Sequence, residues 1–166
     1  SPRFYFSLPA ARKSFAKWNT AYTPNVTLFM GLDAALEMML SEGLENVYAR
    51  HILLARATRA AVRALKLDLL AEDRCASPTV TAVYAPEKIG ADDLRKILRN
   101  EYGVTFAGGQ GILKGKIFRI AHMGFAGKMD VLIAIGALEM ALAKAGYSVE
   151  LGAGVRRAQE IFLEKS

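Results

Sequence analysis

A helix with almost no polar face is the feature that most constrains how this chain folds. Residues 24–41, PNVTLFMGLDAALEMMLS, carry apolar side chains on nearly every side of the helix that their spacing predicts. Such a helix is stable only where other structure covers it, in a core or at an interface. Gly43 is expected to end it, because glycine is favoured just beyond a helix terminus. The segment therefore predicts burial, within this chain or against a partner.

The remaining pattern changes from helical to mixed along the chain. A short amphipathic helix is predicted over 7–18, a turn-rich segment over 19–24 and a long helix over 44–65. The order then becomes strand, strand, helix, strand, strand, helix, helix, over 67–70, 77–85, 91–102, 104–106, 116–122, 128–145 and 155–164. We therefore expect an α/β fold with a small α+β domain, whose helices pack on a mixed, mainly antiparallel sheet attached to the long linking helix.

Composition limits the class of protein without selecting a function. The chain has 166 residues, of which 52% are hydrophobic and 23% charged, enough for one core and unlike a disordered chain. A net charge of +6 is compatible with anionic partners, but basic and aromatic residues are not interleaved as in nucleic-acid-binding surfaces. No apolar run reaches the roughly 18 residues of a membrane span. The single cysteine, Cys75, excludes an internal disulfide and suits a reducing compartment, so we expect a cytoplasmic protein.

Several polar residues are more economically explained as structural. Arg56, Arg59 and Arg63 share one face of the long helix and are expected to form a solvated surface. His51 and His122 have no cysteine or aspartate at ligand spacing, so no metal site is predicted.

The glycine-rich stretch at 108–116, GGQGILKGK, resembles a nucleotide loop only superficially. A P-loop requires a glycine five residues before its Gly-Lys pair and Ser or Thr after it, and here Gln110 and Ile117 occupy those positions. A dinucleotide loop precedes a helix, whereas a strand follows here. We therefore expect a hairpin loop, with room for a close backbone approach to a ligand.

Arg119 raises a question, because it lies in the middle of an apolar strand, IFRIA. Alternation places Ile117, Arg119 and Ala121 on one face of that strand, and small Ala121 leaves space beside the guanidinium. Burying an unpaired guanidinium costs several kcal/mol, so it requires an anionic partner. Two partners remain open at this point. One is an internal carboxylate such as Glu101 or Asp130, and the other is the carboxylate of a bound substrate.

The segment before the apolar helix predicts a second polar feature. Thr23 followed by Pro24 is typical of a helix start, with a hydroxyl N-cap and proline in the first turn. Free N–H groups at that terminus, with the hydroxyls of Thr20 and Thr23, would suit a phosphate. An ordinary capped helix is the alternative.

Three segments, in this order and spacing, carry a resemblance to a known family. They are NTAYTPNVTLFMGLDAALEMMLSEGLENVYARH, SPTVTAVYAP, and GVTFAGGQGILKGKIFRIAHMG followed by a helix. Together they resemble the C-terminal part of class V, fold-type I aminotransferases, in particular the alanine–glyoxylate and serine–pyruvate group. The resemblance extends over nearly the whole chain, and its specificity lies in the combination.

The resemblance implies pyridoxal 5′-phosphate (PLP) chemistry in a homodimer. Arg119 corresponds to the family's strand arginine and would form a salt bridge with the α-carboxylate of the amino-acid or 2-oxo-acid substrate. Thr20 and Thr23, with Asn19, correspond to the segment that reaches the PLP phosphate of the neighbouring subunit. The implied function moves an amino group between alanine or serine and glyoxylate or pyruvate.

One departure from the family is large. The Schiff-base lysine, the aspartate at the pyridine nitrogen and the stacking aromatic belong to a segment with no counterpart here, so no catalytic residue is assigned. We expect residues 1–43 to be the end of the large PLP-binding domain and 44–166 the C-terminal small domain. The chain would then be a fragment that depends on the missing N-terminal large-domain portion and does not transaminate alone. The alternative is a non-catalytic interaction or dimerisation module.

Overall fold

A computed structural model describes residues 4–164. Its contacts divide the chain into two compact units, Ser1–Leu44 and Glu45–Ser166. We refer to them as the N-terminal unit and the C-terminal unit.

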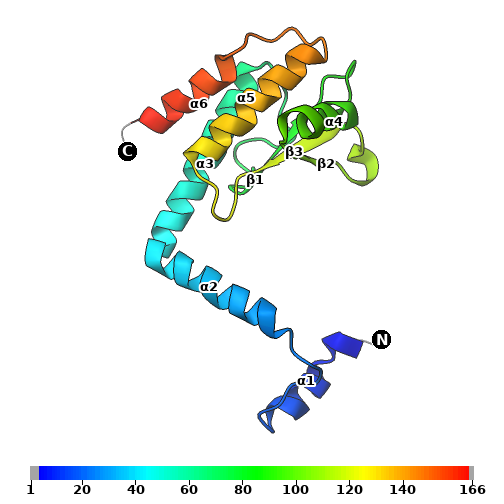
Figure 1. The fold of residues 1–166 in the computed structure, drawn as a ribbon, viewed down its shortest axis with the longest axis vertical. Coiled ribbons are helices and arrows are strands. Elements are labelled where there is room, and N and C mark those ends of the chain that lie inside the picture. The colour runs from blue at the N-terminus through cyan, green and yellow to red at the C-terminus, as the bar shows by residue number, and fades with distance from the viewer. Residues whose placement is uncertain (1–3, 165–166) are drawn as a thin grey trace. The chain divides into compact units, whose positions relative to one another are not determined.

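The N-terminal unit is helical. It contains a 3-10 turn, η1 (Phe4–Phe6), and two helices, α1 (Leu8–Phe15) and α2 (Val26–Glu42) (Figure 1). Ser7 begins α1, because its hydroxyl accepts a hydrogen bond from the amide of Ala10 at 3.4 Å. Tyr22 ties the following turn to η1, because its hydroxyl donates to the Phe4 carbonyl at 2.7 Å. No described residue of this unit is buried, so the predicted apolar helix forms but stays exposed within its own unit.

The start of α2 differs from the expectation. The N-cap is Asn25, not Thr23, and its side-chain oxygen accepts from the Leu28 amide at 3.1 Å. Asparagine caps helices at least as well as threonine, and it follows Pro24, so the helix begins beyond the proline. The predicted end is confirmed, since Gly43 forms the C-cap with φ 85°.

The C-terminal unit combines helices with one small sheet, as the predicted fold class requires. Its elements are α3 (Leu44–Ala64), β1 (Val80–Tyr84), α4 (Ala91–Tyr102), β2 (Ala107–Gly108), the 3-10 turn η2 (Gly111–Leu113), β3 (Ile117–Ala121), α5 (Lys128–Lys144) and α6 (Ala153–Leu163). The strand order is β1-β3-β2, and both pairings are antiparallel. The expected hairpin loop is confirmed, because the segment rich in glycine joins β2 to β3.

Two predicted strands were misplaced. Segment 67–70 pairs only through an isolated bridge between Leu69 and Val83. Segment 104–106 is not a strand, and β2 begins one residue after it. The reason is local, since the Val104 amide bonds to the Leu98 carbonyl at the end of α4 and the Phe106 carbonyl accepts from the Arg95 side chain.

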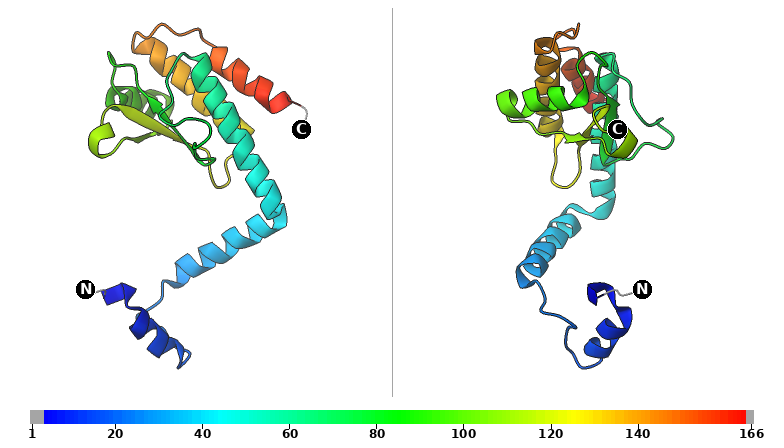
Figure 2. Two further views of the ribbon diagram at one scale, coloured as in Figure 1. Left: turned by 180° about the vertical axis from the view of Figure 1, so that it is seen from behind. Right: turned by 90° about the vertical axis from the view of Figure 1, so that its right-hand side faces the viewer.

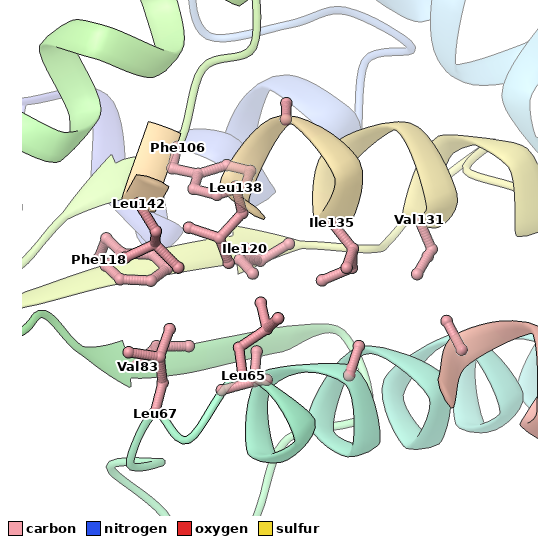
Figure 3. Close-up of a cluster of buried hydrophobic side chains, with 14 of the residues drawn as sticks. Leu65, Leu67, Val83, Phe106, Phe118, Ile120, Val131, Ile135, Leu138 and Leu142 are labelled. Carbon is pink, nitrogen blue, oxygen red and sulfur yellow. The ribbon is translucent and has the colours of Figure 1, made fainter. Parts of the chain in front are cut away.

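The core lies between the helices and one face of the sheet. Thr81 and Val83 of β1 are buried with Phe118 and Ile120 of β3, whereas Tyr84 and Ala121 are exposed. Figure 3 shows side chains from α5, from both strands and from the end of α3 pointing toward one another. Phe106 and Phe118 stack with centroids 5.7 Å apart. The alternation predicted for β3 therefore holds from Phe118 onward, whereas Ile117 at the start of the strand is buried too, although it was expected on the Arg119 face.

Helix α5 organises the helical layer, because it lies between α4 and α6 and contacts both (Figure 2). Its buried Glu139 accepts hydrogen bonds from the amides of Gly152, Gly154 and Val155 at 2.7, 2.8 and 3.1 Å. These amides belong to the first turn of α6 and the residue before it, where a carboxylate satisfies free N–H groups and the helix dipole.

The arginine face of α3 is less solvated than predicted. Arg59 and Arg63 both pair with Asp73, at 3.0 and 2.8 Å, and Arg56 pairs with Glu164 at 2.6 Å. The Arg59 side chain is only 15% exposed. The expectation was wrong for this residue because residues distant along the chain fold over that face.

Candidate functional site

Arg119 lies on the central strand of the sheet, between two alanines. In the register of the sheet, Ala82 of β1 and Ala107 of β2 are its partners on either side. The side chains of Phe118 and Ile120 point into the core, and Arg119 projects from the opposite face of the sheet. Arg119 itself is half-buried. Its two register partners offer only methyl groups, so no side chain directly across the sheet competes for the guanidinium.

The internal ion pair that the sequence left open does not form. Glu101 pairs with Lys144, and Asp130 accepts a hydrogen bond from the Gly127 amide at 2.7 Å. Within residues 4–164, Arg119 makes one hydrogen bond, from Nε to the Gly108 carbonyl at 2.9 Å, and no ion pair. Its Nη1 and Nη2 groups thus keep their donors for a ligand, and two parallel N–H donors match a carboxylate.

The turn after β3 is held by the start of α3. The Arg50 side chain donates to the carbonyls of Gly124 and Ala126, both at 2.9 Å. The Gly124 amide donates to His51 Nε2 at 3.1 Å, while His51 Nδ1 lies 2.7 Å from the Val47 carbonyl. This pattern assigns the neutral ring, with Nδ1 protonated and Nε2 accepting. His51 therefore serves to position the chain next to the strand that carries Arg119.

His122 is a packed residue on the core side of the sheet. It is 1% exposed, and its Nε2 lies 2.9 Å from the Thr81 hydroxyl. Burial lowers its pKa from the ordinary 6.5 to about 4, and the nearby charge of Arg59 acts in the same direction. The ring is therefore neutral at physiological pH, and its burial keeps it away from the face of Arg119. Within residues 4–164, no group of three or more metal-ligating side chains gathers.

The expected phosphate segment lies in the N-terminal unit and borders a groove of about 620 Å³. Asn19 and Thr20 line this groove, together with Arg12 and apolar side chains that include Phe15 and Phe29. The Asn19 side chain accepts a hydrogen bond from the Thr20 amide at 2.8 Å. The Thr20 hydroxyl itself has no partner among the described residues. A hydroxyl and an arginine that border the same groove are chemically suited to a phosphate.

Thr23 is placed differently. It is exposed and does not line the groove, although its hydroxyl also has no partner within residues 4–164. The start of α2, which follows Thr23, already has part of its hydrogen bonds made within the chain. The Asn25 side-chain oxygen accepts from both the Leu28 amide and the Thr27 hydroxyl. The polar groups that stay without a partner in this segment are thus the hydroxyls of Thr20 and Thr23 more than the amides at the start of α2.

Sequence reasoning missed three residues around the two features. Gly108 supplies the carbonyl that Arg119 binds, Ala82 flanks it, and Arg12 lines the groove. The paired glycines at 108 and 109 were visible as a signal of close backbone approach, but their partner depended on the register between β2 and β3. Arg12 carried no signal beyond its place on a short amphipathic helix.

Comparison with known proteins identifies relatives along almost the whole chain. It is 49% identical over 161 residues to the small subunit of a soluble hydrogenase from a Synechococcus species, covering 96% of this chain and 42% of that protein. It is 39% identical over 160 residues to L-aspartate–glyoxylate aminotransferase of Paracoccus denitrificans, covering 96% and 40%. It is 38% identical over 161 residues to serine–glyoxylate aminotransferase of Hyphomicrobium methylovorum, again covering 96% and 40%. No family profile matches the chain.

Solved structures agree with these relatives. The pyridoxamine–pyruvate aminotransferase of Mesorhizobium loti superposes with a TM-score of 0.82 and 42% identity, over 86% of this chain and 37% of that one. The ureidoglycine–glyoxylate aminotransferase of Bacillus subtilis superposes with a TM-score of 0.86 and 29% identity, over 93% of this chain and 41% of that one. No helix within residues 4–164 has the length and apolar character that crossing a bilayer requires.

The chain spans 42% or less of the length of these relatives. Its order of helices and its small antiparallel sheet are those of the C-terminal part of the PLP-transferase fold. The sequence resemblance is therefore confirmed, and the chain is homologous to the C-terminal portion of class V aminotransferases.

Proposed function

We propose that this chain is the C-terminal portion of a PLP-dependent aminotransferase that moves an amino group between a small amino acid, alanine or serine, and a 2-oxo acid, glyoxylate or pyruvate. The observation that carries the proposal is the state of Arg119. Its guanidinium has two free N–H donor groups, no anionic partner among the described residues, and only alanines beside it across the sheet. Relatives named as aspartate–glyoxylate and serine–glyoxylate aminotransferases support the choice of substrates.

In this proposal Arg119 binds the carboxylate of the substrate through Nη1 and Nη2. A bidentate contact fixes the plane of the carboxylate and so restricts the orientation of the adjacent Cα–H bond. PLP supplies the electron sink for the reaction when it is bound. We assign the hydroxyls of Thr20 and Thr23, with Asn19, to its phosphate. We propose that the missing N-terminal large-domain portion supplies the lysine that PLP chemistry requires.

Kinetics of the full-length protein test the role of Arg119. Arg119→Ala removes a charged bidentate contact worth about 2–5 kcal/mol, so KM for glyoxylate or pyruvate should rise about 30-fold or more. Arg119→Lys should recover only part of this, because an ammonium group lacks the planar fork. Arg74→Ala, at a side chain 82% exposed, serves as the control. An unchanged KM in Arg119→Ala would contradict the assignment.

PLP affinity tests the phosphate assignment independently. Thr20→Val and Thr23→Val each remove one hydroxyl donor, and each should weaken PLP binding about tenfold. Thr105→Val, at an exposed threonine of the other unit, is the matched control. If both variants bind PLP as tightly as the parent, the phosphate lies elsewhere.

The names of the relatives also suggest a direct test. Two curated relatives are named as soluble hydrogenase subunits, whereas others are named as aminotransferases. Purified full-length protein should contain PLP that borohydride fixes covalently to the large domain. Stoichiometric iron or nickel without PLP would contradict the aminotransferase proposal.

The exposed helix α2 supports a further part of the proposal, which is assembly. Its apolar side chains include Leu28, Phe29 and Met30, which are 69%, 62% and 67% exposed. Exposed apolar surfaces of this kind mark interaction sites. We propose that the full-length enzyme is a homodimer in which α2 is covered. Sedimentation of the full-length protein as a monomer would contradict the homodimer, and assembly without PLP binding would favour the interaction-module alternative.

A further inference from the structure

Two arginines converge on one glycine beside the proposed carboxylate site. Arg119 Nε donates to the Gly108 carbonyl at 2.9 Å, which leaves Nη1 and Nη2 at the far end of the guanidinium. A carboxylate must then approach the guanidinium end-on, through those two nitrogens, because its Nε edge is occupied. The Gly108 carbonyl thus determines which edge of Arg119 faces a ligand.

Arg95 of α4 binds the backbone two residues before this carbonyl and is itself held by a carboxylate of its own helix. Its Nε donates to the Phe106 carbonyl at 2.8 Å, and its Nη1 donates to Asp92 at 3.0 Å. Its guanidinium also lies against Gly108, where a Cβ would come within 2.7 Å of Nη1 and 3.1 Å of Cζ. The Arg95 side chain therefore fills the space that any other residue at 108 would need.

We propose that Arg95, acting through Gly108, is a positioning residue that sets the orientation in which Arg119 receives a carboxylate. The inference rests on the proposed function, in which Arg119 binds the substrate. An arginine side chain loses considerable rotamer freedom when it is ordered, so a fixed acceptor for Nε lowers the entropy lost on binding. Strand β2 is only two residues long, and Arg95 binds the carbonyl of the residue directly before it.

The experiment compares variants of the full-length enzyme in steady-state kinetics with glyoxylate and pyruvate. Arg95→Met keeps an unbranched side chain but loses the donors to Phe106 and the contact with Asp92. We expect KM for both oxo acids to rise about tenfold, with kcat changed less than about threefold. Arg99→Met, on the same helix at an exposed arginine, is the control and should leave both constants unchanged.

A double-mutant cycle separates positioning from a merely structural role. In the Arg119→Ala background, Arg95→Met should have no further effect on KM, because the residue that it positions is absent. A structural role would lower activity equally in both backgrounds. An equal effect in both backgrounds would therefore overturn the inference.

Gly108→Ala provides a second route that does not depend on the folding of Arg95→Met. Its methyl group collides with Arg95, so the single variant should raise KM about tenfold. Combining Gly108→Ala with Arg95→Ala removes the collision, and the double variant should be no worse than Arg95→Ala alone. Additive losses would show that the glycine and the arginine act separately and would overturn the proposal.

The two proposals fail in distinguishable ways. If Arg119→Ala leaves KM unchanged, the proposed function of Arg119 is wrong and the positioning role is wrong with it. If Arg119→Ala raises KM while Arg95→Met and Gly108→Ala do not, only the positioning role is wrong.

Discussion

The two units of this chain treat their apolar residues in opposite ways. Every buried residue among 4–164 lies in the C-terminal unit, while α2 in the N-terminal unit exposes nearly all its leucines, methionines and its phenylalanine. The C-terminal unit therefore has a core that stabilises its sheet and helices. The N-terminal unit has apolar helices but no buried residue among those described, and short isolated helices are marginal in water. Matched substitutions in the two units should therefore have very different effects.

The largest difference is expected for a leucine truncated in each unit. Leu138→Ala in α5 empties a fully buried position and should lower the free energy of unfolding by about 3 kcal/mol. Leu36→Ala in α2 removes a side chain that is already 46% exposed, so its cost in this chain should be below about 1 kcal/mol. Urea denaturation of the two variants measures the change in the free energy of unfolding. Equal losses would mean that α2 is packed as well as α5.

The pH dependence of stability should report on His122 and hence on the C-terminal unit alone. Because burial lowers its folded pKa to about 4, the unfolded chain binds the proton more tightly. The neutral His122 ring therefore contributes about 3 kcal/mol to the free energy of unfolding. This contribution is fully present above about pH 6.5 and is lost as the pH falls toward 4. His122→Gln should remove this part of the slope, whereas His51→Gln should retain it. An unaltered slope in His122→Gln would show that other groups cause the acid sensitivity.

A smaller contrast concerns two glutamates on helices. Glu139→Gln exchanges one carboxylate oxygen for an NH₂ group that cannot accept, so at least one amide at the start of α6 loses its partner. We expect a loss of about 2 kcal/mol in denaturant unfolding. Glu37→Gln in α2, at an exposed position, should change stability by less than about 0.5 kcal/mol. A neutral Glu139→Gln would mean that the α5–α6 connection does not depend on this carboxylate.

Alanine substitution of two helical glycines should change stability in opposite directions, which is the smallest effect that tests the comparison. A Cβ at Gly31 in α2 meets no atom within 4 Å, so Gly31→Ala should stabilise that helix by about 1 kcal/mol. A Cβ at Gly154 in α6 would lie 2.9 Å from Ile135 and 3.0 Å from Leu65, so Gly154→Ala should destabilise by about 2 kcal/mol. Helicity by circular dichroism follows the first, and thermal unfolding follows the second. A destabilising Gly31→Ala would indicate a neighbour against α2.

What the sequence could predict depended on whether the signal was local. Helix α4 was predicted with the bounds that the structure shows, because Asp92, Asp93 and Gly103 mark its ends within one turn. The cap at Asn25 and the place of β2 were missed, since the first depends on where the proline lies and the second on pairing with β3. The face of Arg119 followed from alternation. Its lack of an internal partner did not, because Glu101 and Asp130 find their partners through the tertiary fold.

The alternation of β3 has a consequence for how the chain avoids misfolding. A slip of one residue against its neighbours would turn Phe118 and Ile120 to the outside and drive the Arg119 cation into the apolar layer. That arrangement combines exposed aromatic surface with a buried unpaired charge, each costly, so it cannot compete with the native pairing. The arginine that we assign to the substrate therefore also helps to specify the register of β3. A chain in which Arg119 lies on the wrong face of the sheet has not reached the native fold.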